Sequence, residues 1–214
     1  MTSFILLPGL NGDLRIFDQL APRLTSCTVV AWIEPRYREP FSSYVKRLSA
    51  SIPGSDDEVV VGVSFGGIIA RELAVQRGAK GCAHISSVRD HNNLPKSIRG
   101  LRLVTPLVTE LTLSAFGTLA SFSPFRRDYW ARIGQALRGE KGAWRRWAVS
   151  SLLRWKANPQ SEAIPLLQIH GDRDATIPIS KRPLVLVIPG GGHLIAFTHA
   201  EEIALEIRRF AESL

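Results

Sequence analysis

Residues 58–70 read EVVVGVSFGGIIA, and this stretch says more about the fold than any other part of the chain. A run of β-branched residues ends at Gly62, Ser64 follows, and an apolar stretch typical of a helix begins near Gly66. Glycine at positions 62 and 66 lets a strand and a helix pack closely, since a side chain there would clash with the backbone. The stretch therefore predicts a strand, a sharp turn that exposes the Ser64 hydroxyl, and a helix. A turn serine without a chemical role is the alternative that these residues alone leave open.

Two later segments supply the partners that a reactive serine needs. Residues 168–178 (QIHGDRDATIP) place Asp172 and Asp174 in a loop after an apolar strand, and residues 185–194 (VLVIPGGGHL) place His193 in a glycine loop after another strand. A serine hydroxyl is a poor nucleophile at neutral pH, so a histidine must take its proton and a carboxylate must orient the imidazole. The chain order of serine, aspartate and histidine, each just after a strand, matches one known order of such a triad.

The chain outside these motifs alternates between apolar strands and helical patterns. Strands are predicted at 4–7, 28–32, 58–63, 82–86, 166–169 and 184–188. Helices are predicted at 14–24, 42–52 and 66–77, and a last helix begins at Thr198, where Thr198 and Glu201 form a capping box. Continuously apolar strands that alternate with helices predict an α/β protein, with a mostly parallel sheet covered by helices on both faces.

A basic, tryptophan-rich segment at 88–157 interrupts this alternation. It contains four of the five tryptophans, and residues 88–156 carry 13 Lys and Arg against 4 Asp and Glu, so the basic excess of the chain lies here. We predict a helical cap at 88–157, inserted into a core made of residues 1–87 and 158–214. The aromatic stripe of this cap either packs on the core or roofs a substrate pocket, and the candidate substrate contacts are Trp130, Trp144 and Trp147.

Length and composition fit a single domain with a hydrophobic core, since the chain has 214 residues of which 45% are hydrophobic. The two cysteines, Cys27 and Cys82, show no metal-binding spacing, and reduced thiols suit a cytoplasmic protein. The N-terminus does not read as a signal peptide, and the longest apolar stretch, 101–125, is broken by charges and a proline, so no membrane span is expected. We expect no metal, no organic cofactor and no nucleic-acid partner, because none of their binding motifs is present.

Taken together, the motifs GVSFGG (62–67), HGDRD (170–174) and GGH (191–193) resemble those of the α/β-hydrolase superfamily. The resemblance covers roughly residues 1–88 and 163–214, and it implies a minimal member with about six strands. It identifies the turn at Ser64 as a nucleophile elbow, with Ser64 as the nucleophile and His193 as the general base. It also implies that Asp174, the fourth residue of the Gly-x-x-Asp segment, is the acid, while Asp172 is the alternative.

The resemblance further implies an oxyanion hole made of two backbone N–H groups, those of Leu10 and Phe65. The loop that would supply Leu10 reads PGLNGD at 8–13, where the family commonly has His-Gly. Backbone donors survive a change of side chain, so we still expect the hole. Asn11 in this loop either contacts the substrate or only shapes the turn.

A serine nucleophile in this fold implies acyl transfer to water, and we expect cleavage of small or medium, largely apolar carboxylic esters. The basic cap favours anionic acyl thioesters as an alternative substrate class, although a solvated basic face that keeps the protein soluble is the simpler explanation of the charge. A C–C hydrolase or lyase uses the same triad, and a non-catalytic ligand-binding protein is the alternative of another class.

Overall fold

The computed structural model describes residues 1–94, 142–177, 179 and 185–214 of the chain. The predicted substrate contact Trp130 and most of the predicted cap lie outside these residues. The chain forms two compact units. The first comprises Met1–Ala31, Val45–Pro95 and Lys156–Leu214, and the second comprises Trp32–Tyr44 and Lys96–Trp155.

The first unit is built on a six-stranded sheet in which every neighbouring pair of strands is parallel. The spatial order is β2-β1-β3-β4-β5-β6. The strands are β1 (Ser3–Leu7), β2 (Cys27–Val29), β3 (Glu58–Val63), β4 (Gly81–Ile85), β5 (Leu166–Gly171) and β6 (Val185–Ile188). This arrangement confirms the predicted α/β class and the predicted parallel sheet of six strands. The second strand ends at Val29, earlier than the predicted residue 32.

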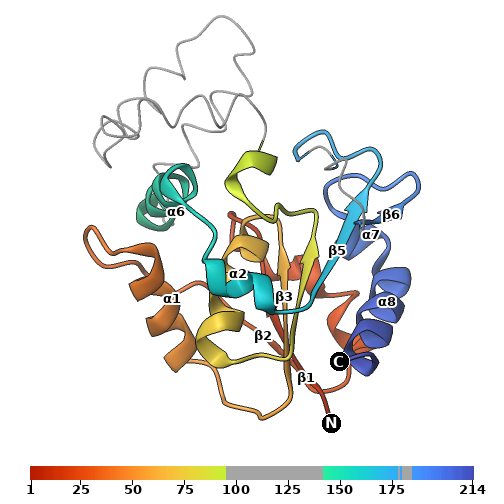
Figure 1. The fold of residues 1–214 in the computed structure, drawn as a ribbon. Coiled ribbons are helices and arrows are strands. Elements are labelled where there is room, and N and C mark those ends of the chain that lie inside the picture. Colours follow the sequence, from red (N-terminus) through yellow and green to blue (C-terminus); the bar gives the residue numbers. More distant parts are fainter. Residues whose placement is uncertain (95–141, 178, 180–184) are drawn as a thin grey trace, which may run out of the picture. The chain divides into compact units, whose positions relative to one another are not determined.

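Helices cover both faces of the sheet (Figure 1). The helix α2 (Phe65–Arg77) packs on β3 and β4, while α7 (Ile195–Thr198) and α8 (Ala200–Glu212) belong to the opposite side. Val61 in the centre of β3 and Ile203 and Ile207 of α8 lie in one buried hydrophobic cluster. All residues of β3 are buried, which agrees with its continuous run of apolar residues.

The remaining helical elements differ in places from the prediction. They are α1 (Phe41–Ala50), α6 (Gly142–Arg154), and the 3₁₀ turns η1 (Leu14–Phe17), η2 (Ala21–Arg23), η3 (His91–Asn93) and η5 (Pro159–Ala163). The predicted helix at 14–24 is wrong, because two separate 3₁₀ turns form there, with a proline at the start of the second. None of the described helices is long and apolar enough to cross a membrane.

The predicted capping box at the start of the last helix is also wrong. Thr198 ends α7, and its hydroxyl donates to the backbone oxygen of Leu194 at 3.3 Å. The N-cap of α8 is His199, which makes no side-chain capping bond. Because Thr198 already belongs to the preceding helical turn, its hydroxyl is used there.

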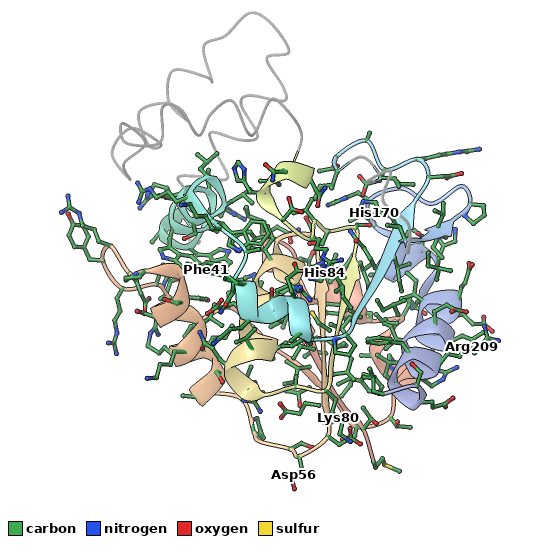
Figure 2. The ribbon with its side chains drawn as sticks, in the orientation of Figure 1. Phe41, Asp56, Lys80, His84, His170 and Arg209 are labelled. Atoms are coloured by element: carbon green, nitrogen blue, oxygen red, sulfur yellow. The ribbon has the colours of Figure 1, made fainter. Side chains whose placement is uncertain are left out.

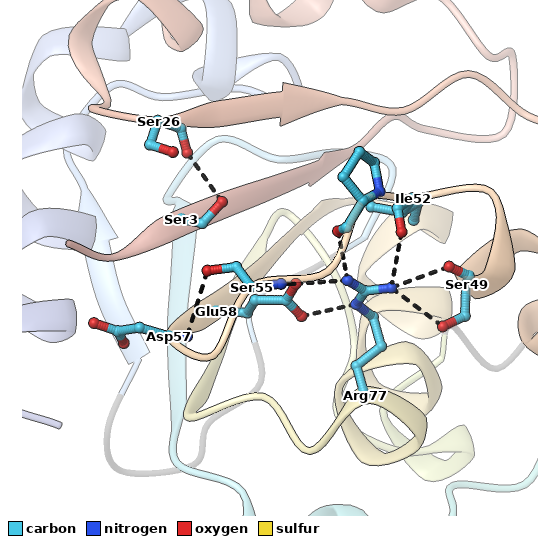
Figure 3. Close-up of polar contacts among 9 residues, drawn as sticks. Ser3, Ser26, Ser49, Ile52, Ser55, Asp57, Glu58 and Arg77 are labelled. Atoms are coloured by element: carbon cyan, nitrogen blue, oxygen red, sulfur yellow. Dashed lines mark hydrogen bonds and ion pairs between the residues drawn. The ribbon is translucent and has the colours of Figure 1, made fainter.

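A buried ion pair fixes the base of the strand–turn–helix unit formed by β3 and α2 (Figure 3). Arg77 in the last turn of α2 donates to both carboxylate oxygens of Glu58 at the start of β3, at 2.7 and 2.5 Å. The same guanidinium also donates to backbone oxygens of Ser49, Ile52 and Pro53. Side-chain exposure is 8% for Arg77 and 3% for Glu58, so the ion pair itself is buried.

The second unit contains an aromatic cluster. Trp144 of α6 stacks on Trp32, with ring centroids 4.8 Å apart, and Trp147 lies over Tyr44 at 4.1 Å. The indole N–H of Trp147 donates to the backbone oxygen of Glu39 at 2.8 Å. Trp144 and Trp147 are only 2% and 4% exposed, so the aromatic stripe of α6 is packed against rings from residues 32–44. The division into core and cap at 88–157 stays a prediction.

Candidate active site

The structure forms the predicted strand, turn and helix around Ser64. Ser64 lies between β3 and α2 with φ 55° and ψ −121°, a conformation that costs a residue with a side chain about 1–3 kcal/mol. A Cβ atom at Gly62 would overlap the backbone of Gly66, and one at Gly66 would overlap the carbonyl oxygens of Leu7 and Pro8. Glycine is therefore required at both positions, for the steric reason that the sequence indicated.

The side chains of Ser64, His193 and Asp174 form one hydrogen-bonded chain, although they come from three separate loops. His193 Nε2 lies 3.1 Å from Ser64 Oγ, and His193 Nδ1 lies 2.8 Å from Asp174 Oδ2. Because a carboxylate only accepts hydrogen bonds, Nδ1 carries the proton and Nε2 is free to accept from the Ser64 hydroxyl. This is the tautomer that a general base needs.

The surroundings of Asp174 keep it ionised. Its side chain has no exposed surface, and Oδ1 accepts from the backbone N–H groups of Thr176 at 2.8 Å and Ile177 at 2.9 Å. Burial by itself raises the pKa of this carboxyl, but the hydrogen bonds from His193, Ile177 and Thr176 outweigh it, and the pKa lies below its ordinary value. Asp174 therefore faces His193 as a buried anion.

His170 contacts the loop that contains Asp174, and the sequence did not indicate this contact. The side chain, labelled in Figure 2, is 1% exposed, and its Nε2 lies 2.9 Å from the backbone oxygen of Ile177 and 3.5 Å from Asp174 Oδ2. Burial lowers the pKa of His170, although the hydrogen bond to Ile177 and the charge of Asp174 raise it. The neutral ring thus holds the segment that supplies the amide of Ile177 to Asp174.

The two candidate acids lie in different environments. Asp172 Oδ1 accepts from the backbone N–H of Gly190 at 2.7 Å, whereas Asp174 contacts His193. The exposed carboxylate of Asp172 thus fixes the glycine loop that follows β6. The structure brings Asp174, and not Asp172, to the histidine.

The loop after β1 lies directly against the elbow. A Cβ atom placed on Gly9 would be 3.8 Å from Ser64 Cβ, so the residue that precedes Leu10 lies close to the serine. Asn11 is exposed, and its side-chain oxygen accepts from the backbone N–H of Asp13 at 3.2 Å, which is the turn role left open by the sequence. The oxyanion hole made by Leu10 and Phe65 stays a prediction.

Ser87 is the second site residue that sequence reasoning missed. Its hydroxyl donates to the backbone oxygen of Ser64 at 2.6 Å. The sequence signal for Ser87 is Gly67, a glycine just outside the five-residue elbow motif, because a Cβ atom at position 67 would overlap Ser87. Among the described residues, no group of three or more His, Cys, Asp or Glu side chains is placed to hold a metal ion.

A parallel α/β sheet that presents a serine on a strand-to-helix elbow, next to a histidine and a buried aspartate, has the architecture of an α/β hydrolase. The chain belongs to the alpha/beta hydrolase family, whose family model matches residues 4–206. No curated protein is matched by the sequence.

Several solved structures share this fold at low sequence identity. A lipase-esterase related protein from Clostridium acetobutylicum is 14% identical, with 98% of this chain and 94% of that chain covered and a TM-score of 0.64. A thermophilic esterase from Thermogutta terrifontis is 15% identical, with coverage of 100% and 90% and a TM-score of 0.59. A meta-cleavage product hydrolase from Pseudomonas fluorescens is 15% identical, with coverage of 100% and 91% and a TM-score of 0.63. Likeness at this level of identity establishes the fold alone.

Proposed function

We propose that this protein is a serine hydrolase that cleaves carboxylic esters through Ser64, His193 and Asp174. The observation that carries the proposal is the continuous chain from Ser64 Oγ to His193 Nε2 at 3.1 Å and from His193 Nδ1 to Asp174 Oδ2 at 2.8 Å. A solvated turn serine would need neither partner. The strained backbone of Ser64 further supports a chemical role, since strain of this kind is concentrated at functional sites.

The reaction follows from this geometry in two halves. Ser64 Oγ attacks the acyl carbonyl carbon while His193 Nε2 takes the hydroxyl proton, and Asp174 stabilises the imidazolium that forms. The backbone N–H groups of Leu10 and Phe65 stabilise the tetrahedral oxyanion. The intermediate expels the alcohol, which takes its proton from His193, and the acyl group remains on Ser64. A water then gives a proton to His193, attacks the acyl-enzyme, and releases the carboxylic acid as Ser64 regains its proton.

The proposed substrate is a small or medium ester with a largely apolar acyl group. The fold neighbours include proteins described as an esterase and as lipase-esterase related, which agrees with this substrate class. We retain the predicted cap as the source of specificity, with Trp130, Trp144 and Trp147 as the predicted contacts, although the rings of Trp144 and Trp147 are only 2% and 4% exposed. We also propose a cytoplasmic location, which the two free thiols, Cys27 and Cys82, support.

The test is hydrolysis of p-nitrophenyl esters from acetate to palmitate by the wild type and by Ser64→Ala. We expect turnover by the wild type and a loss of about a thousandfold or more in kcat for the variant, because the nucleophile is removed. Thermal unfolding of both proteins provides the control for folding. Full activity in Ser64→Ala would refute the mechanism. If the wild type cleaved no ester but did cleave acyl thioesters or C–C bonds, the ester assignment would be replaced; with no turnover at all, a binding role would replace it.

A further inference from the structure

Residues at and just after the end of β4 make hydrogen bonds to both the N–H and the carbonyl oxygen of Ser64. Its N–H donates to the backbone oxygen of Ile85 at 2.9 Å. Its carbonyl oxygen accepts from the amide of Gly67 at 3.0 Å and from the hydroxyl of Ser87 at 2.6 Å. The Ser87 contact is the shortest of the three, and it is made by a side chain that is 1% exposed.

The fold fixes Ser87 in this place. The residue before it, Ser86, has φ 50°, and its N–H donates to the backbone oxygen of Ile169 at 2.9 Å, so the chain bends sharply just after β4. The side chain of Gln168, in β5, donates from Nε2 to the backbone oxygen of Ser87 at 3.2 Å within the protein interior. The backbone at Ser87 is thus fixed by contacts with β5, and this places its hydroxyl against the carbonyl oxygen of Ser64.

Gly67 makes room for this contact. A Cβ atom at position 67 would overlap Ser87 Oγ and lie 2.6 Å from Ser87 Cβ. Gly67 lies in the first turn of α2, where alanine would be favoured over glycine by about 1 kcal/mol if helix propensity alone decided. Its glycine is therefore explained by the close approach of Ser87.

The carbonyl that Ser87 holds belongs to the same peptide group as the N–H of Phe65. A trans peptide group is planar, and the described residues contain no cis peptide bond. The carbonyl oxygen of Ser64 and the N–H of Phe65 therefore point in opposite directions, and a group that fixes one also aims the other. A hydrogen bond accepted by the carbonyl also polarises the peptide and strengthens its N–H as a donor.

We propose that Ser87 is a positioning residue that aims and polarises the Phe65 N–H toward the oxyanion. This inference rests on the proposed function, because it assumes that Ser64 forms a tetrahedral oxyanion. Loss of a whole oxyanion donor costs about a hundredfold to a thousandfold in kcat. Ser87→Ala leaves the donor in place and removes only its support, so we expect a loss of about tenfold in kcat, with KM changed less than about twofold.

The experiment compares the wild type, Ser87→Ala, Gly67→Ala and the control Ser86→Ala in two assays. One is turnover of the best p-nitrophenyl ester. The other is inhibition by a trifluoromethyl ketone of the same chain length, which Ser64 Oγ attacks to form an anionic hemiketal while its proton passes to His193. The ketone copies the transition state, so its Ki should follow kcat/KM and not KM. Ser86 is a matched control because its hydroxyl is equally buried but has no hydrogen-bond partner among the residues that the structure describes.

We expect Ser87→Ala to raise the ketone Ki by about the same factor as it lowers kcat/KM, and Ser86→Ala to change neither beyond about twofold. Gly67→Ala keeps the Ser87 hydroxyl but displaces it, so this variant should also lower kcat/KM and raise the ketone Ki. The inference therefore stays testable if Ser87→Ala fails to fold. An active wild type with unchanged kcat in Ser87→Ala, or a slower variant with unchanged ketone affinity, would overturn the inference and leave the proposed function intact. A wild type that neither turns over ester nor binds the ketone would overturn both.

Discussion

Replacing Asp174 with asparagine should abolish most of the activity while keeping the shape of the site. The loss of activity depends on the direction in which the new side-chain amide points. Thr176 and Ile177 donate their backbone N–H groups to Oδ1 at 2.8 and 2.9 Å, so that position must remain an oxygen. The NH₂ group is therefore forced into the place of Oδ2, which lies 2.8 Å from His193 Nδ1.

That orientation places the proton on the wrong nitrogen of His193. Nδ1 must accept from the amide, so the ring carries its proton on Nε2, the atom that lies 3.1 Å from Ser64 Oγ. A protonated Nε2 cannot take the serine proton. For a triad with the same fault, the loss is about 10⁴-fold in kcat, which corresponds to about 5 kcal/mol in the activation free energy.

The assay is kcat and KM for a p-nitrophenyl ester at neutral pH, with Asp172→Asn as the matched control. Asp172 accepts one backbone N–H from Gly190, and asparagine keeps an oxygen for that bond, so we expect kcat within about threefold of the wild type. Thermal unfolding shows whether both variants are folded. The reverse ranking, with Asp172→Asn inactive and Asp174→Asn active, would refute the reasoning and reassign the acid.

Two further predictions concern stability. Arg77→Met should lower the free energy of unfolding by about 3–5 kcal/mol in urea titrations, because it leaves the 3%-exposed carboxylate of Glu58 without its cation. The double variant with Glu58→Gln should lose less, and a loss below about 1 kcal/mol in the single variant would contradict this account. His84 is fully buried, and burial, with the nearby charge of Arg71, lowers its pKa from 6.5 to about 3. Because the unfolded chain binds this proton below about pH 6.5 and the folded chain does not, stability should fall as pH drops from about 6.5 toward 3, by up to about 1.4 kcal/mol per pH unit for this group. His84→Gln should flatten that slope between pH 7 and pH 5, and an unchanged slope would show that His84 does not cause it.

Sequence reasoning succeeded where local chemistry decides the structure. The strands are continuously apolar, and the glycines at 62 and 66 allow the close approach of β3 and α2, so the parallel sheet and the elbow could both be predicted. The nearness of Ser64, Asp174 and His193 could also be expected, because each follows a strand, and parallel strands end at the same edge of the sheet. Their catalytic roles stay a prediction.

The supports of the site could not be read, because they depend on contacts between distant segments. Ser87 and Ser64 are 23 residues apart and meet through a bend at Ser86 with positive φ, which no local pattern announces. His170 lies near the end of β5, and no local pattern indicates that its ring contacts the backbone oxygen of Ile177. The pairing of residues 32–44 with α6 was missed for the same reason, since its aromatic rings lie more than 100 residues apart in the chain.

The strain at Ser64 connects these supports to the stability of the fold. A positive φ at a serine persists only where the surroundings fix the backbone on both sides. At the tip, Ile85 and Ser87 hold the two polar groups of Ser64. At the base, Arg77 ties the end of α2 to the start of β3 through Glu58. The unit of β3, the turn and α2 is thus held by hydrogen bonds at the turn and by the ion pair at its other end. The turn cannot relax without breaking a buried contact. It follows that loss of the contacts at the tip should change the reaction rate at Ser64, whereas loss of the ion pair at the base should lower the stability of the fold.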